Sequence, residues 1–179
     1  MTGTATETPR LWTPEGFRED AWRHAETLDA SGGNEAVILP LAAFRALDAE
    51  TRKALAGRIG VVLAPGESLD AIVPFLGDLA LVALAFPAFN DGRSFSKAEL
   101  LRSRHAYAGP LRAVGDVLID QIPHMLRTGF TEFEVKNPTA LKRLAEGRLG
   151  GLPLHYQPTA APAGSAGGYS WRRKPAAAA

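Results

Sequence analysis

The segment from Leu79 to Asp120 indicates the fold of the whole chain. It reads LALVALAF (79–86), PAFNDGRSFS (87–96), KAELLRSR (97–104) and, beyond a Gly-Pro break, LRAVGDVLID (111–120). The first run is almost continuously apolar, which is typical of a strand covered on both faces. A polar loop, a helix, a second strand and the start of a second helix follow. Polar side chains at the carboxyl end of such a strand mark the place where α/β sheets and barrels usually bind ligands.

The same alternation extends in both directions from this segment. The predicted strands are Ala36–Leu39, Ile59–Ala64, Ala80–Phe86, Leu111–Val114, Glu132–Val135 and a peripheral Leu152–Gln157. The predicted helices are Leu41–Ala56, one from about Ser68 that Pro74 weakens or shortens, Lys97–His105, Asp116–Thr128 and Pro138–Glu146. Alternating β-α units predict an α/β fold with a mostly parallel sheet, either open with three layers or curled like part of a barrel.

The composition predicts one α/β domain over residues 11–157. Residues 1–10 are small and polar, and residues 158–179 are rich in Ala, Gly and Pro, so both ends are expected to be disordered. Bulky apolar side chains between them, Leu11, Trp12, Phe17 and Trp22, are expected to pack across the domain as an N-terminal arm.

Charge and residue usage exclude several classes of protein. Hydrophobic residues are 46% and the formal net charge is +1, so nothing favours nucleic acid or a membrane surface as a partner. The chain has no cysteine, which rules out disulfides, thiolate nucleophiles and cysteine-ligated metals. The N-terminal residues lack the features of a secretory signal, and a cytoplasmic location is expected.

The candidate site lies where the parallel strands end and the following helices begin. Arg93 in its glycine-containing loop, just ahead of a helix N-terminus, is expected to hold a sulfate, phosphate or carboxylate. Asp91 and Asp116 would orient that arginine, bind a hydroxyl or act as a base. The ligand-binding candidates are Asp91, Gly92, Arg93, Ser94, Ser96, Arg102, Arg112, Gly115, Asp116, Asp120 and Gln121.

Structural roles compete with function at several of these positions. Asp116 is expected to cap a helix, and Ser96 with Glu99 matches a capping box. The alternative for Arg93 is that it fastens the loop by pairing with Asp91 or Asp116, and Arg102 would lie on a solvated helix face. Arg112 falls inside a strand, so its charge must pair or reach an edge.

No motif for a cofactor or a metal is present. The histidines, at 24, 105, 124 and 155, lack metal-ligand spacing, so no metal is predicted. There is no G-x-G-x-x-G, Walker A loop or G-x-S-x-G elbow. The identity of any cofactor and any catalytic residue therefore stays open.

The central residues resemble a bacterial family called domain of unknown function 934, whose members often carry the label of an oxidoreductase of sulfite reduction. The resemblance rests on FPAFNDGRSFS (86–96), LLR (100–102), LRAVGDVLIDQ (111–121) and GFTEF (129–133), with a weaker match at Tyr156-Gln157. It covers the middle third strongly and most of the chain loosely.

The resemblance implies a role in assimilatory sulfate and sulfite reduction. We expect an accessory protein that binds sulfite reductase, another enzyme of sulfate assimilation, or the anionic substrate. One alternative is an oxidoreductase with a bound flavin or nicotinamide. A second alternative is an α/β protein that binds a small anion without redox chemistry. Whether the chain is catalytic and which oligomer it forms stay open.

Overall fold

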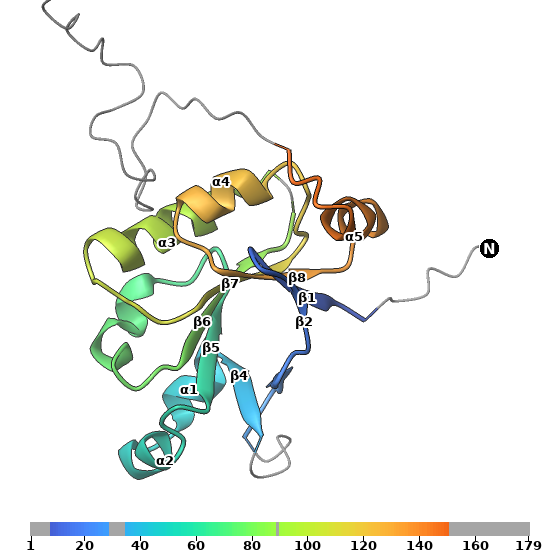
Figure 1. Ribbon diagram of the computed structural model, residues 1–179. Helices are drawn as coiled ribbons and strands as arrows, with labels where there is room; N and C mark the ends of the chain where they lie inside the picture. The colour runs from blue at the N-terminus through green and yellow to red at the C-terminus, as the bar shows by residue number, and fades with distance from the viewer. Residues whose placement is uncertain (1–7, 29–34, 89, 151–179) are drawn as a thin grey trace, which may run out of the picture.

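A single sheet organises the part of the chain that the computed structural model describes, residues 8–28, 35–88 and 90–150 (Figure 1). Within these residues the sheet has eight strands in the order β2-β1-β8-β7-β6-β5-β4-β3. They are β1 (Arg10–Thr13), β2 (Gly16–Arg18), β3 (Trp22–His24), β4 (Ala36–Pro40), β5 (Ile59–Leu63), β6 (Leu81–Phe86), β7 (Leu111–Gly115) and β8 (Glu132–Val135). The predicted strand Leu152–Gln157 and the tail lie outside the described residues, as do residues 1–7.

Strands β3 to β8 are parallel and follow one another in the order of the sequence. The predicted α/β fold with a mostly parallel sheet is confirmed. Because each crossover moves to the next strand in the same direction, right-handed connections place the helices on one face. The sheet curls away from that face into a half-barrel, which decides between the open and the curled alternatives (Figure 1).

Successive residues of a strand point alternately to the helices and to the concave face of the sheet. On β6, Val82, Leu84 and Phe86 face the helices and are fully buried in the main core. Leu81 and Ala83 point to the concave face, where they form a smaller apolar cluster with Ile38 and Val114 and with the partly buried Trp22. The continuous apolar run in the sequence therefore reflects burial on both faces of this strand.

The N-terminal arm contributes three strands that the sequence did not predict. β1 pairs antiparallel with β8, and the buried Trp12 lies beside Phe133 with ring centroids 5.4 Å apart. Only residues 19–21 separate β2 from β3, although these strands are the opposite edges of the sheet. Three linking residues span at most about 14 Å, so the two edges must come close together, which requires a curled sheet.

Most of the helices are shorter than predicted, and the helix after β6 alone is longer. Within the described residues they are α1 (Leu41–Ala46), α2 (Ala49–Ala54), η2 (Leu69–Ala71), η3 (Val73–Phe75), α3 (Arg93–Ser103), α4 (Ile122–Arg127) and α5 (Pro138–Ala145). The helix predicted over Leu41–Ala56 is divided in two because Leu47 is extended and Asp48 starts a new helix, its Oδ1 accepting from the Thr51 amide at 2.7 Å.

The segment after Ser68 forms two turns of 3₁₀-helix rather than an α-helix. Ser68 caps the first turn by accepting a hydrogen bond from the Asp70 amide, as predicted. Pro74 lies in the second turn, where its missing amide hydrogen and its ring stop the segment from continuing as an α-helix.

Two predicted helix starts were wrong. α3 begins at Arg93 with Gly92 in the capping position, so Ser96 is an exposed residue inside the helix and no cap. α4 begins at Ile122, six residues after Asp116, so Asp116 caps no helix. The start of α5 is as predicted, and Asn137 caps it by accepting from the Ala140 amide at 3.0 Å.

Candidate functional site

Backbone contacts join the loops at the carboxyl ends of β6 and β7. The Asp116 amide donates to the Phe86 carbonyl at 2.7 Å, and Phe86 pairs with Gly115 in the sheet. Gly115 has a φ of +98°, and a Cβ there would lie 2.4 Å from the Phe86 oxygen. Only glycine fits this approach. The loop that ends at Ser94 and the Gly115-Asp116 turn are therefore neighbours, as the sequence predicted.

The start of α3 is anchored to the sheet. Ser94 is fully buried, and its Oγ donates to the Ala85 carbonyl at 2.7 Å. The Phe95 ring packs edge-on against Phe86, with centroids 5.1 Å apart. These contacts fix the first turn of the helix, so that Arg93 leaves from a rigid position.

Arg93 forms a two-point ion pair with Asp91. Its Nε and Nη2 donate to the two carboxylate oxygens at 2.9 and 2.7 Å. The hydrogen bonds from Arg93 hold the pKa of Asp91 below its usual value, and Asp91 raises the pKa of Arg93. The Arg93 side chain is nevertheless 64% exposed. Its Nη1 makes no hydrogen bond within the described residues and lies 3.9 Å from the position that a Cβ would take on Gly66.

Lys97 lies one helical turn beyond Arg93 and was not among the predicted site residues. It is 8% exposed, and its Nζ donates to the Ala64 carbonyl at 2.6 Å, at the end of β5. Burial lowers its pKa, an effect opposed by the nearby Glu67 carboxylate. Glu67 in turn accepts from the Ala64 amide at 2.7 Å. The spacing of four residues after Arg93 is the sequence signal that places both cations on one side of α3.

Together these groups form a compact charged cluster at the carboxyl edge of β5 and β6. Arg93 and Lys97 supply positive charge, and Asp91 and Glu67 hold the loops in place. The N-terminus of an eleven-residue helix adds the partial positive charge of the helix dipole, although the amides of Arg93 and Phe95 already donate to Asp91 and Gly92. Chemically, the arrangement can attract and orient a small anion, whose charge would lie beside the exposed guanidinium.

Arg102 lies at the opposite edge of the sheet from this cluster. Its Nε and Nη2 donate to the Gly129 carbonyl at 3.0 and 2.9 Å, and its Nη1 donates to the carbonyls of Gly109 and Tyr107. These acceptors precede β7 and β8, so Arg102 fastens the amino ends of the two strands. The expectation that it lies on a solvated helix face was wrong.

Arg112 lies on the concave face of the half-barrel and is fully buried. It donates to Asp20 at 2.8 and 3.0 Å, to Glu132 at 2.8 Å and to Glu134 at 3.1 Å. Burial alone would lower the pKa of Arg112, but Asp20 and Glu132 raise it. Glu134 Oε1 also lies within hydrogen-bond distance, 2.8 Å, of His24 Nε2. The prediction that Arg112 must find a partner is thus fulfilled on the concave face, away from Arg93.

The remaining predicted residues surround the start of α4. Asp120 is exposed, and Gln121 is partly buried directly before the helix. The structure therefore brings together Asp91, Gly92, Arg93, Ser94, Gly115 and Asp116, and places Arg102 and Arg112 elsewhere.

In the described part of the chain, no three His, Cys, Asp or Glu side chains form a group that could hold a metal ion. No helix among the described residues is long and apolar enough to cross a membrane.

The fold and this cluster define the class of protein: a half-barrel α/β domain with charged side chains at the carboxyl edge of its sheet. A family model described as "Bacterial protein of unknown function (DUF934)" matches residues 60–165, which include β6 to β8, all of β5 but its first residue, and the Arg93 loop. The chain belongs to this family. No curated protein and no solved structure matches this chain.

Proposed function

We propose that this protein binds a small oxyanion at the carboxyl edge of β5 and β6, and that it acts as an accessory protein in sulfite reduction. The observation that carries the proposal is the state of Arg93. Its guanidinium is held by Asp91 on one side, is 64% exposed and keeps Nη1 directed toward Gly66. Lys97, one helical turn away, places a second positive charge near this guanidinium.

Sulfite and sulfate are the proposed ligands because of the family resemblance. Both are compact anions with several oxygens that can accept hydrogen bonds from a planar guanidinium. The helix N-terminus and Lys97 would add favourable charge without contributing a specific shape.

Calorimetric titration of sulfite and of sulfate into the purified protein tests the binding step. The wild-type protein should bind at least one of them at millimolar concentration. Arg93→Lys keeps the charge but loses the planar fork, so affinity should fall roughly tenfold or more. Arg104→Lys is the matched control, because Arg104 is an exposed arginine at the other end of the same helix. Absence of binding to the wild-type protein would refute the oxyanion site.

The accessory role is tested separately. Tagged protein recovered from sulfate-grown cells should bring down a sulfite-reducing enzyme, and Arg93→Lys should not abolish that association if the anion site and the partner surface are distinct. The absorbance spectrum of freshly purified protein tests the redox alternative: flavin bands would show that the protein carries its own cofactor and would replace the accessory proposal.

A further inference from the structure

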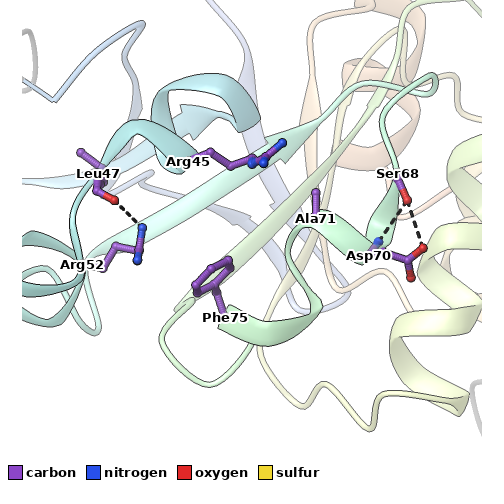
Figure 2. Close-up of a pocket in the computed structure, with 7 residues that line it drawn as sticks. All are labelled: Arg45, Leu47, Arg52, Ser68, Asp70, Ala71 and Phe75. Atoms are coloured by element: carbon purple, nitrogen blue, oxygen red, sulfur yellow. Dashed lines mark hydrogen bonds between the residues drawn. The ribbon is translucent and has the colours of Figure 1, made fainter.

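A hollow lies on the helical side of the sheet, between the β4–β5 and β5–β6 connections. It is an open pocket of about 620 Å³, lined by α1, α2 and the two 3₁₀ turns (Figure 2). This volume lies within the range of pockets that bind small organic ligands. None of the residues that line it belongs to the Arg93 cluster, although Ser68 directly follows Glu67 in the chain.

One wall of the pocket is positively charged. Arg45, in the last turn of α1, is exposed and forms no ion pair or hydrogen bond within the described residues. Figure 2 shows its side chain extending from α1 toward the side on which Ala71 and Asp70 lie. A free guanidinium that lines a pocket offers a two-point site for a carboxylate or a phosphate.

Arg52 gives the same wall a flat, fixed surface. It donates to the Leu47 carbonyl, and its guanidinium carbon lies 4.7 Å from the centroid of the Phe75 ring. Phe75 is held in turn by an edge-on contact with Phe44, with centroids 5.6 Å apart. A planar group of a ligand could stack on this assembly at little entropic cost, because both side chains are already ordered.

The opposite wall carries hydrogen-bond acceptors. Ser68 and Asp70 lie at the start of η2, where the Ser68 hydroxyl contacts Asp70 Oδ2 at 3.3 Å. The Asp70 carboxylate pairs with neither Arg45 nor Arg52. An N–H or O–H group of a ligand would find an acceptor there.

We propose that this pocket binds a small organic anion that carries a planar ring and a hydrogen-bond donor, the chemical class to which nucleoside monophosphates belong. Arg45 receives the anionic group, the Arg52–Phe75 surface stacks against the ring, and Asp70 accepts from the donor. This site is independent of the oxyanion site at Arg93.

Three probes separate the parts of this proposal. Adenosine monophosphate has the anion and the ring, inorganic phosphate has the anion alone, and adenosine has the ring alone. In calorimetric titrations of the full chain, adenosine monophosphate should bind measurably at low millimolar concentration, and each partial probe should bind roughly tenfold or more weakly. Failure of adenosine monophosphate to bind, or an equal binding of phosphate that Arg45→Ala weakens, would overturn the proposal.

Variants then assign the binding to this pocket. Arg45→Ala should weaken the binding of adenosine monophosphate roughly tenfold or more, while Arg104→Ala, on the distant α3, should leave it unchanged. Arg93→Lys should also leave it unchanged, which separates this result from the fate of the oxyanion site. Circular dichroism spectra equal to that of the wild type show that the variants are folded. An Arg45→Ala protein that binds as well as the wild type would contradict the assignment.

Discussion

Arg112 and Arg93 belong to adjacent β-α units, and their surroundings differ in every respect. Arg112 is fully buried and contacts three carboxylates on the concave face. Arg93 is 64% exposed and contacts one carboxylate at the carboxyl edge. The guanidinium of Arg112 is paired with carboxylates of the protein itself, whereas Arg93 keeps one amino group, Nη1, open to solvent. The difference teaches that burial and full pairing mark an arginine that holds the fold, and partial pairing marks one available to a ligand.

The largest effect should come from Arg112→Met. Removing the guanidinium leaves Asp20, Glu132 and Glu134 close together without a cation, and breaking a buried ionic network in this way costs roughly 3–5 kcal/mol. Denaturant unfolding should show this loss in the free energy of unfolding. Arg104→Met, at an exposed position, should change it little. An equal and small effect of both substitutions would mean that Arg112 is no more important to the fold than a surface arginine.

Acid should destabilise the protein mainly through the carboxylates of the concave face. Burial alone would raise the pKa of Glu134, but His24 and Arg112 outweigh it and hold this pKa below its usual value. A carboxyl whose pKa is lower in the folded state stabilises the fold above its unfolded pKa, roughly 4.3, and this stabilisation is lost as the pH falls through the folded value.

The stability of the wild-type protein should therefore fall as the pH drops below about 4.3, and Glu134→Gln should have a shallower fall. Asp91→Asn, at the exposed ion pair, should change the acid slope much less, because solvent screens that pair. Thermal melting at a series of pH values measures all three slopes. A shallower slope for Asp91→Asn than for Glu134→Gln would reverse the comparison of the two regions.

Lys97→Met should have an intermediate effect on stability. The substitution loses the hydrogen bond to the Ala64 carbonyl but also removes the cost of burying an ammonium group, so the net change should stay within about 1 kcal/mol. Sulfite or sulfate affinity should nevertheless fall, because positive charge is removed from the cluster. Unfolding and titration of the same sample compare the two effects. Unchanged affinity would limit the oxyanion site to Arg93.

Arg93→Lys should have the smallest effect on stability. Lysine can still pair with Asp91 across solvent, so the melting temperature should match that of the wild type within the scatter of the measurement. A clear fall in the melting temperature would show that the Arg93–Asp91 pair fastens the loop, and would place Arg93 in the same group as Arg112.

The parallel core of the fold could be predicted from the sequence, and the arm could not. Four largely apolar runs predicted β4 to β7, and the alternating segment Glu132–Val135 predicted β8. β2 and β3 have only three residues each, and the four residues of β1 pair with β8 far along the chain, so no local pattern reveals these strands. The partners of Arg112 were hidden for the same reason, since Asp20 lies on that arm.

The position of the candidate site in the fold could be predicted from the sequence, but not all of the residues that form it. Neighbouring strands and a glycine turn put the Arg93 loop beside Gly115, which follows from topology. Lys97 was missed because helical lysines usually face solvent, and the face of α3 that is buried depends on where the helix starts. That start was misplaced because Ser96 and Glu99 match a capping box, while the actual start is fixed by the Ser94 and Phe95 contacts with β6.

The pairing of β1 with β8 has a consequence for how the chain is made. The ribosome releases β1 first and β8 last among the strands described. The contact between Trp12 and Phe133 therefore cannot form until nearly the whole domain has been synthesised. Contacts between residues so distant in sequence form slowly. During translation the apolar side chains of the arm would stay open to water or to chaperones, and the two ends of the sheet would join only after the last strand has left the ribosome.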